Sequence, residues 1–454
     1  MWAKRAMAID WTQPIDTGEA PVDGEKFDVI VVGGGPGGSA AAAYAAMDGN
    51  KVLLIEKDVW PRDKVCGDAV GGKSLRHVKE LGVKEMIEQT PHFRVTGMLF
   101  SSSNGQNVTI SLPKEDVERR EAGYALPRIQ FDYMMFKRAT DLVISNGGKV
   151  VQGTKVIEVN HDSGPQQKIT GVVIEGGSVT SHAAPLVIGA GGWRCPVAQK
   201  IVNELHGEDM RDDQHMCGAY REYWTGVKDV GDEEGAIELH FVDDVIPGYW
   251  WIFPVQKGMV NVGIGMVISE QRKQKGVKKS LRKLQQHLIQ EHPLFKERFA
   301  DATMVKGSGK GWQLPFGSPR KGQKLQPRRT AMAGAMCIGD AASLVDPFSG
   351  EGVGNALLSA KLAVSLFDSS KHASGFPEDL AQQYMVELWG ALGPELSNSF
   401  KIQKIVKRKR LMNMFVRKAA KRPALQDALT DALASKEAQK KLHSPLWLIR
   451  NIIL

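Results

Sequence analysis

A glycine-rich turn constrains the fold of this 454-residue chain more than any other feature. Residues 27–32 read Phe-Asp-Val-Ile-Val-Val, a short β-branched run that is typical of a buried parallel strand. Residues 33–38 read Gly-Gly-Gly-Pro-Gly-Gly, and a helix-like alanine run follows at 39–46. A strand, such a turn and a helix in this order predict an α/β domain of the Rossmann type that binds a dinucleotide.

Four residues carry the expected contacts with the dinucleotide. Gly33 would make the tight turn, Gly35 would let the backbone approach a pyrophosphate at the helix N-terminus, and Gly38 would let helix and strand pack closely. Glu56 ends a second predicted strand at 51–55, 23 residues after Gly33, where an acid accepts hydrogen bonds from a ribose. The alternative is a glycine-rich turn without a ligand, and with a ligand the motif suits either FAD or NAD.

A second glycine element far along the chain favours FAD. A predicted strand at 330–338 leads into Gly339 and Asp340, and Gly350 and Gly352 precede a helical pattern at 355–367. A carboxylate there suits a ribityl chain, and N–H groups at a glycine-rich helix entry suit the flavin edge that carries charge after reduction. An NAD site needs no such distant element.

These motifs resemble the aromatic-hydroxylase superfamily of FAD enzymes, together with the segment Leu-Pro-Arg-Ile-Gln-Phe-Asp at 126–132. In that superfamily the arginine before the central helix contacts FAD, which implies this role for Arg128. The segment 187–194 departs from the superfamily, because Gly191 stands where its G-A-D-G element has an aspartate. That element is tied to FAD and NADPH handling, so NADPH as the electron donor is put in doubt.

Two further segments resemble the geranylgeranyl reductase family, and the nearest likeness is to archaeal enzymes that saturate digeranylgeranylglycerol lipids. They are Cys-Gly-Asp at 66–68 and Tyr-Trp-Trp-Ile-Phe-Pro at 249–254, and the resemblance covers about residues 26–367. It implies a Rossmann-like FAD-binding domain interleaved with an antiparallel-sheet substrate domain, plus a C-terminal helical region. The expected ranges are 1–24 for an N-terminal arm, 25–90, 116–210 and 330–370 for the FAD-binding domain, 91–115 and 211–329 for the substrate domain, and 371–454 for the helical region.

Alternation in the aromatic segment places Tyr249, Trp251 and Phe253 on one face of a strand. That face either forms ordinary core or, as the resemblance favours, walls an apolar tunnel for a polyprenyl lipid. Cys66 is a candidate steric gate or proton donor at the flavin, against the plainer alternative of a small buried residue. Cys66, Tyr249 and Trp251 are therefore the catalytic candidates. Tyr220 joins Tyr249, Trp251 and Phe253 as a substrate-binding candidate through its Tyr-Arg-Glu segment.

Positive charge is concentrated near the C-terminus. Residues 401–422 hold ten of the 59 Lys and Arg and no acid, so the rest of the chain carries 49 basic against 51 acidic residues. Helices are expected at 380–391, 396–420 and 424–442. Ile402, Ile405, Val406, Met412 and Phe415 approximate one apolar helical face. Such a basic amphipathic helix suits an anionic membrane surface, whereas the alternative is a helix docked on the protein with its charges solvated.

These features predict a cytoplasmic protein that is peripheral on the inner membrane surface and binds no nucleic acid. The four cysteines show no spacing of a metal site or a disulfide framework, and the N-terminal segment lacks the apolar core of a signal peptide.

The expected activity is reduction of C=C bonds in geranylgeranyl or polyprenyl lipids by hydride from reduced FAD. The external electron donor is a ferredoxin, NADPH or another reductant. The first alternative is an FAD-dependent monooxygenase or halogenase of the same superfamily. A prenyl-lipid carrier on the same scaffold is the alternative outside catalysis.

Overall fold

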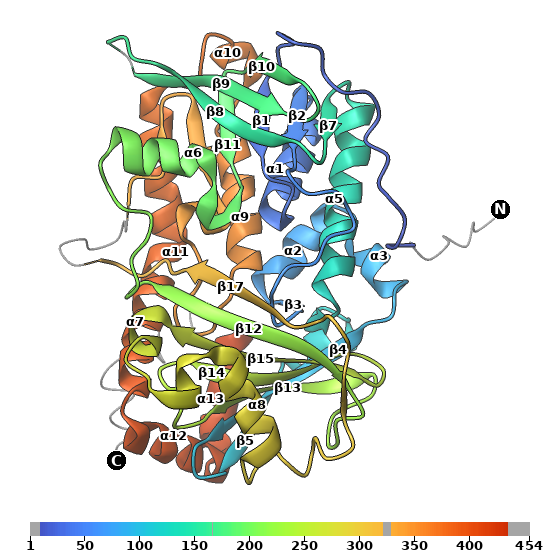
Figure 1. Cartoon of the computed structure of the whole chain (residues 1–454), viewed down its shortest axis with the longest axis vertical. Coiled ribbons are helices and arrows are strands. Elements are labelled where there is room, and N and C mark those ends of the chain that lie inside the picture. The colour runs from blue at the N-terminus through green and yellow to red at the C-terminus, as the bar shows by residue number, and fades with distance from the viewer. Residues whose placement is uncertain (1–9, 166, 321–327, 435–454) are drawn as a thin grey trace.

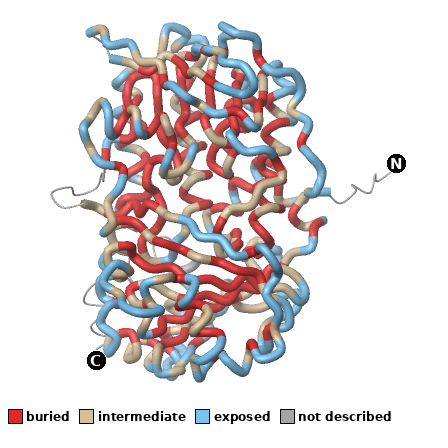
Figure 2. The backbone as a smooth tube through the Cα atoms, in the orientation of Figure 1, coloured by how far each residue is buried: buried red, intermediate tan, exposed pale blue. Residues whose placement is uncertain are grey.

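The computed structural model describes residues 10–165, 167–320 and 328–434. Figure 1 shows a mainly parallel sheet in the upper half of the molecule and a larger sheet in the lower half, with helix α11 (Glu378–Val406) running beside both. Buried residues follow the two sheets and the helices that pack on them (Figure 2).

The upper sheet is the predicted dinucleotide-binding sheet. Its strands, in spatial order, are β18 (Ala331–Met332), β19 (Ala335–Cys337), β11 (Leu186–Gly189), β1 (Val29–Val32), β2 (Val52–Ile55) and β7 (Lys149–Val151). Every pair except β18–β19 is parallel. All residues of β1, β2 and β11 are buried, because helices α1 (Pro36–Met47), α5 (Arg128–Ser145) and α9 (Val353–Ser365) pack around the sheet. The pairing of β11 with β19 brings the second glycine element beside the first.

A small antiparallel sheet lies at the upper end of the molecule. It consists of β8 (Lys155–Asp162), β9 (Lys168–Glu175) and β10 (Val179–Ala183).

The lower sheet has ten strands. Eight follow one path, in the order β16 (Thr303–Met304), β12 (Met216–Thr225), β15 (Met259–Val267), β14 (Tyr249–Gln256), β13 (Glu234–Phe241), β4 (Phe93–Ser102), β6 (Gly123–Ala125) and β3 (Ala69–Gly71). Strand β17 (Lys310–Pro315) pairs with β12, and β5 (Asn107–Ser111) pairs with β4. Most pairs are antiparallel, as expected, but β4 and β13 run parallel. Strands β3 and β6 also belong to this sheet, although their residues fall in the ranges assigned to the FAD-binding domain.

Different helices pack on the two faces of the lower sheet. Trp250 and Ile252 of β14 pack on one side with helix α8 (Leu281–Glu291). Trp251 and Phe253 lie in a second cluster on the opposite side, which includes Val416 of helix α12 (Lys409–Lys421). The alternation expected for this strand is therefore present, and its second face points toward the cofactor half.

The C-terminal helices differ in their boundaries from the expected ones. Helix α11 continues through Pro394, where the sequence predicted a break, and the chain breaks instead at Lys407 and Arg408. A proline inside a helix costs about 3 kcal/mol, but Leu388, Leu392 and Leu396 are buried on both sides of it and offset that cost. Helix α13 (Pro423–Ala434) follows α12, and the remainder of the predicted helix at 424–442 lies outside the described residues.

The described part of the N-terminal arm is anchored rather than loose. Ile15 is 2% exposed, its carbonyl oxygen accepts a 2.8 Å hydrogen bond from Gln152 Nε2, and Trp11 packs on the core.

Candidate functional site

The first glycine element forms a tight backbone cradle at the start of α1. Gly33 adopts φ +108°, and a Cβ on it would lie 2.6 Å from the carbonyl oxygen of Ala190. A Cβ on Gly38 would lie 1.8 Å from the carbonyl oxygen of Gly33, so only glycine permits this approach of helix to strand. At Gly35 the nearest atom would be 3.6 Å away, which leaves open space in front of the helix N-terminus. The cradle therefore fits a pyrophosphate.

Glu56 is held rigidly beside this cradle. It is 3% exposed, its Oε2 accepts a 2.8 Å hydrogen bond from the Gly34 N–H, and its Oε1 accepts a 3.0 Å bond from the Asp58 N–H. The side chain lines the same cavity as Gly33 and Gly35. A fixed carboxylate at the end of β2 can accept hydrogen bonds from ribose hydroxyls, as the sequence predicted.

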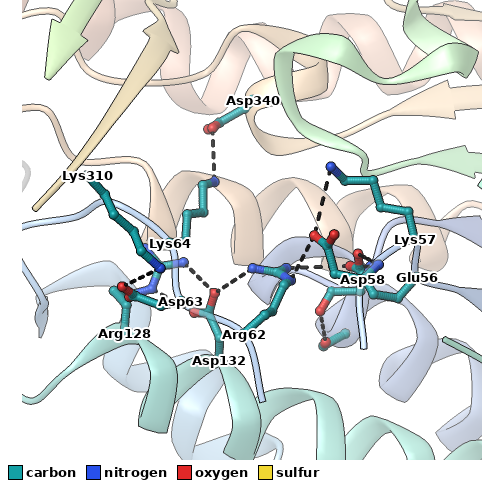
Figure 3. Close-up of polar contacts among 12 residues, drawn as sticks. Glu56, Lys57, Asp58, Arg62, Asp63, Lys64, Arg128, Asp132, Lys310 and Asp340 are labelled. Carbon is teal, nitrogen blue, oxygen red and sulfur yellow. Dashed lines mark hydrogen bonds and ion pairs between the residues drawn. The ribbon is translucent and has the colours of Figure 1, made fainter. Parts of the chain in front are cut away.

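A charged loop at 57–65 crosses the site and was missed by the sequence reasoning (Figure 3). Arg62 lies 3.5 Å from Glu56 and 3.6 Å from Asp132, whereas Lys64 lies 3.3 Å from Asp340. Asp63 pairs with Lys310 at 3.1 Å. The loop thus connects the first glycine element, the second glycine element and the lower sheet. The dense alternation of charges just before Cys66 is the sequence feature that marks it.

Arg128 begins helix α5 and forms a buried ion pair with Asp132 across one helical turn. Its Nε lies 2.6 Å from Oδ1 and its Nη2 lies 2.9 Å from Oδ2. Burial alone would disfavour the charge, but the Asp132 carboxylate holds the pKa of Arg128 well above its usual value. Arg128 and Cys66 both line the cavity, so the structure brings these two predicted residues together.

The second glycine element reaches the same cavity from the other end of the chain. Gly339 has φ +55° and directly follows β19 and Ile338, and Asp340 lies next to it in a short helical turn. Gly352 is the N-cap of α9, and Gly350, with φ +75°, lies where a Cβ would be 3.0 Å from the Tyr249 hydroxyl. Gly339, Asp340, Gly350 and Gly352 all line the cavity. The two elements therefore bracket one elongated ligand, as FAD requires.

The cavity has a volume of about 910 Å³ and extends from the glycine cradles to the lower sheet. Tyr249, Trp251 and Phe253 form an aromatic wall on this side of β14. Trp312, Leu314, Phe316 and Phe348 add further apolar lining. Tyr249 donates a hydrogen bond to the Ser349 carbonyl oxygen, and Trp251 Nε1 donates a 2.7 Å bond to Asn261 Oδ1. The wall is thus a fixed apolar surface that continues directly from the cofactor groove.

Tyr220 was expected in this cavity, but the structure places it elsewhere. Its side chain packs with the α8 cluster on the opposite face of the sheet, and its hydroxyl donates a 2.8 Å hydrogen bond to Glu222. Residues of a strand alternate between faces, so Ala219 and Cys217 line the cavity in its place.

The other three cysteines lie in different surroundings. Cys195 and Cys337 are fully buried. Cys217, however, lines the cavity, and burial raises the pKa of its thiol to about 12.

Gly191 lies close to the turn that follows β11. It lines the cavity, and a Cβ on it would lie 3.2 Å from the Cα of Cys195. A larger residue there would press on the turn that follows β11.

The similarity of this chain to known proteins supports FAD as the ligand of the cavity. Residues 26–305 match the family model described as "FAD binding domain". The chain is 30% identical to a menaquinone reductase of Mycobacterium tuberculosis over 365 residues, which cover 79% of this chain and 81% of the relative. It is 27% identical to a digeranylgeranylglycerophospholipid reductase of Methanococcus aeolicus over 365 residues, which again cover 79% of this chain and 81% of the relative.

Solved structures share the fold. A geranylgeranyl bacteriochlorophyll reductase-like protein of Thermoplasma acidophilum superposes with a TM-score of 0.74 at 23% identity, covering 94% of this chain and 96% of its own. The flavin-dependent brominase Bmp2 gives a TM-score of 0.63 at 18% identity, with 92% of each chain covered. The glycine cradles, the fixed Glu56 and the matched family together identify the ligand of the cavity as FAD. The chain belongs to the FAD-binding domain family and is an FAD-dependent oxidoreductase.

Proposed function

We propose that this protein saturates C=C bonds in the polyprenyl chain of an isoprenoid lipid. The observation that carries the proposal is the continuity of one cavity, in which the FAD cradles and the wall of Tyr249, Trp251 and Phe253 face the same space. A polyprenyl chain offers little for polar recognition, so an apolar surface of defined shape is what it needs. Menaquinone and digeranylgeranylglycerophospholipid, the compounds in the relatives' names, share such a chain.

Different residues of the cavity would bind the cofactor and the lipid. FAD would be held by Gly33, Glu56, Arg128 and Asp340, and it supplies a hydride when it is bound and reduced. The aromatic wall holds the alkene and excludes water, which would otherwise compete with the lipid. One carbon of the alkene gains the hydride and the other gains a proton, so the product has two more hydrogens than the substrate.

Cys66 is the proposed source of that proton. Its thiol lines the cavity, whereas the Tyr249 hydroxyl is already bound to a backbone carbonyl oxygen and burial raises its pKa. Water must restore the thiol proton after each turnover. An external electron donor must also reduce the FAD, and a ferredoxin and NADPH are the two donors to compare.

The test is an anaerobic turnover with two lipids. The FAD-loaded protein is reduced chemically and mixed with menaquinone or with digeranylgeranylglycerophospholipid, and the flavin spectrum and the product mass are recorded. Flavin reoxidation with a gain of two hydrogens that persists after exposure of the product to air supports chain saturation. A menaquinone product that returns to its original mass in air has been reduced on its quinone ring, which contradicts the proposal. In a parallel assay in air, consumption of oxygen coupled to lipid turnover contradicts the proposal in favour of a monooxygenase.

We also propose that the protein is peripheral on the inner membrane surface, where its lipid substrate resides. The apolar face of the basic segment does not serve this purpose, because Val406 and Met412 are buried in the protein core and only Ile405 is exposed.

The cationic side chains Arg408, Arg410, Arg417 and Lys421 point outward and suit anionic headgroups. Gln403, from the same stretch, lines the cavity. Among the described helices, none is long and apolar enough to cross a bilayer. The sequence at 446–454, Leu-Trp-Leu-Ile-Arg-Asn-Ile-Ile-Leu, also suits a membrane interface, but these residues lie outside the described part of the chain.

A further inference from the structure

Polar side chains of the lower sheet hold the segment 63–68 at several points. Arg221 Nη2 donates to Asp63 Oδ1 at 2.8 Å and to the Lys64 carbonyl oxygen at 3.1 Å. Asn261 and Tyr223 hold the other end of the segment. Asn261 Nδ2 donates to the Cys66 carbonyl oxygen at 2.7 Å, and the Tyr223 hydroxyl donates to Asp68 Oδ2 at 2.6 Å. Strands β12 and β15, which carry the three donors, are neighbours in the sheet.

These donors lie where apolar residues would ordinarily fill the core. Arg221, Asn261 and Asp68 are 0% exposed and Tyr223 is 7% exposed. Burying a carboxylate or a guanidinium is costly unless it is paired and hydrogen-bonded. Asp68 also adopts φ +70°, which is unfavourable for a residue other than glycine. Burial raises the pKa of Asp68 to about 6, against the opposing effect of Arg221 and Tyr223. Stability alone does not account for this arrangement, so a function for it is indicated.

The same network reaches the wall of the cavity. Asn261 uses its amide nitrogen for the Cys66 carbonyl oxygen and its amide oxygen for the indole N–H of Trp251. On the same side, a Cβ on Gly67 would lie 2.8 Å from the Phe253 ring, so the loop and the wall are in close contact. One buried amide thus sets the distance between the loop that carries the cavity thiol and the aromatic surface opposite.

We propose that Tyr223 and Asn261 are positioning residues that fix the Cys66 loop relative to the aromatic wall. Tyr223 acts through Asp68, and Asn261 acts through the backbone of Cys66. Neither Tyr223 nor Asn261 lines the cavity. The kinetic consequence rests on the proposed function, because only a polyprenyl reductase needs the thiol at a set distance from a bound alkene. The position of the loop can be measured without any substrate.

The test compares Tyr223→Phe with Tyr220→Phe in the full-length, FAD-loaded protein. Both substitutions remove one phenol hydroxyl from strand β12, but the Tyr220 hydroxyl bonds Glu222 on the opposite face of the sheet. Hydrogen exchange of residues 63–68 and alkylation of Cys66 by iodoacetamide, quantified on peptides, report the loop. Strand β8, in the small sheet at the opposite end of the molecule, reports whether the substitution acts beyond the loop.

For Tyr223→Phe we expect about tenfold faster exchange in the loop and faster Cys66 alkylation, since the hydrogen bond to a charged group is lost. Strand β8 and the Tyr220→Phe protein should match the wild type. With an accepted lipid, Tyr223→Phe should lower kcat more than it raises KM. Equal exchange and alkylation in the two variants would overturn the proposal.

If Tyr223→Phe does not fold, Asn261→Leu tests the same loop through the Cys66 carbonyl. Faster loop exchange with an unchanged β8 supports the proposal, and an unchanged loop overturns it. A wild-type protein that turns over no polyprenyl lipid contradicts the proposed function instead, and leaves the exchange result standing.

Discussion

Arg128 and Asp132 form a two-point ion pair within the first turns of α5, with N–O distances of 2.6 and 2.9 Å. A cation at a helix N-terminus is opposed by the helix dipole, so the carboxylate at the next turn compensates for it. The pair is buried, and it keeps a guanidinium at the cavity beside Cys66. A residue of the cofactor site is therefore also part of the structural core.

Arg128→Met should abolish FAD binding and lower the free energy of unfolding by about 3–5 kcal/mol, because it leaves Asp132 buried with a weaker partner. The double substitution Arg128→Met with Asp132→Leu should recover much of that stability but no FAD binding. Urea denaturation and FAD titration measure the two effects separately. Recovery of FAD binding in the double variant would show that Arg128 acts only through stability.

Trp251→Phe should reduce kcat/KM for the polyprenyl lipid by about 10-fold or more, because the wall loses area and a hydrogen bond to Asn261. FAD affinity should stay unchanged. Trp250→Phe is the matched control, since Trp250 is the neighbouring tryptophan on the opposite face of β14. Steady-state turnover with both proteins checks this, and an equal loss of kcat/KM in the control would contradict the assignment of the wall.

Asp68→Asn should change how stability depends on pH. The folded-state pKa of Asp68 is raised to about 6 from its usual 3.8, so the folded state binds its proton more strongly than the unfolded state. The wild type therefore loses stability as the pH rises from about 4 to 6, by up to about 3 kcal/mol at 1.36 kcal/mol per pKa unit. Asn cannot titrate and should lack this loss. Urea denaturation of both proteins between pH 4 and 7 measures the difference, and parallel curves would contradict a buried titrating Asp68.

Neutralising Arg408, Arg410, Arg417 and Lys421 with glutamine should weaken flotation with anionic liposomes, by about 1 kcal/mol for each residue near the headgroups. The control replaces four exposed lysines elsewhere with glutamine, so that net charge changes equally: Lys257, Lys275, Lys283 and Lys306. Flotation that falls equally in both proteins would show a general charge effect rather than a docking surface.

The cofactor half of the site could be predicted from short stretches of sequence. The strand, turn and helix around Gly33 and Gly38 depend on local backbone geometry, which only glycine satisfies at those contacts. Glu56 and Asp340 were recognisable because each directly follows a strand or glycine of the expected kind. The alternation of Tyr249, Trp251 and Phe253 is likewise a property of any strand.

In the C-terminal segment, the local sequence pattern was not enough to predict how its apolar side packs. Val406, Met412 and Phe415 do form an apolar side, as their spacing indicates, but strands β4 and β5 cover α12 in the folded chain. An amphipathic pattern establishes that a face is apolar without establishing what covers it.

The FAD fold, the two glycine elements and the aromatic strand were predictable from the sequence alone, because each is encoded by neighbouring residues. The orientation of Tyr220 away from the cavity, and the hydrogen bonds from Tyr223 and Asn261 to the Cys66 loop, became visible only in the folded chain. Those contacts join residues on separate strands and loops, and they depend on which face of the lower sheet meets the cofactor half. That choice is made by the packing of the two sheets against each other.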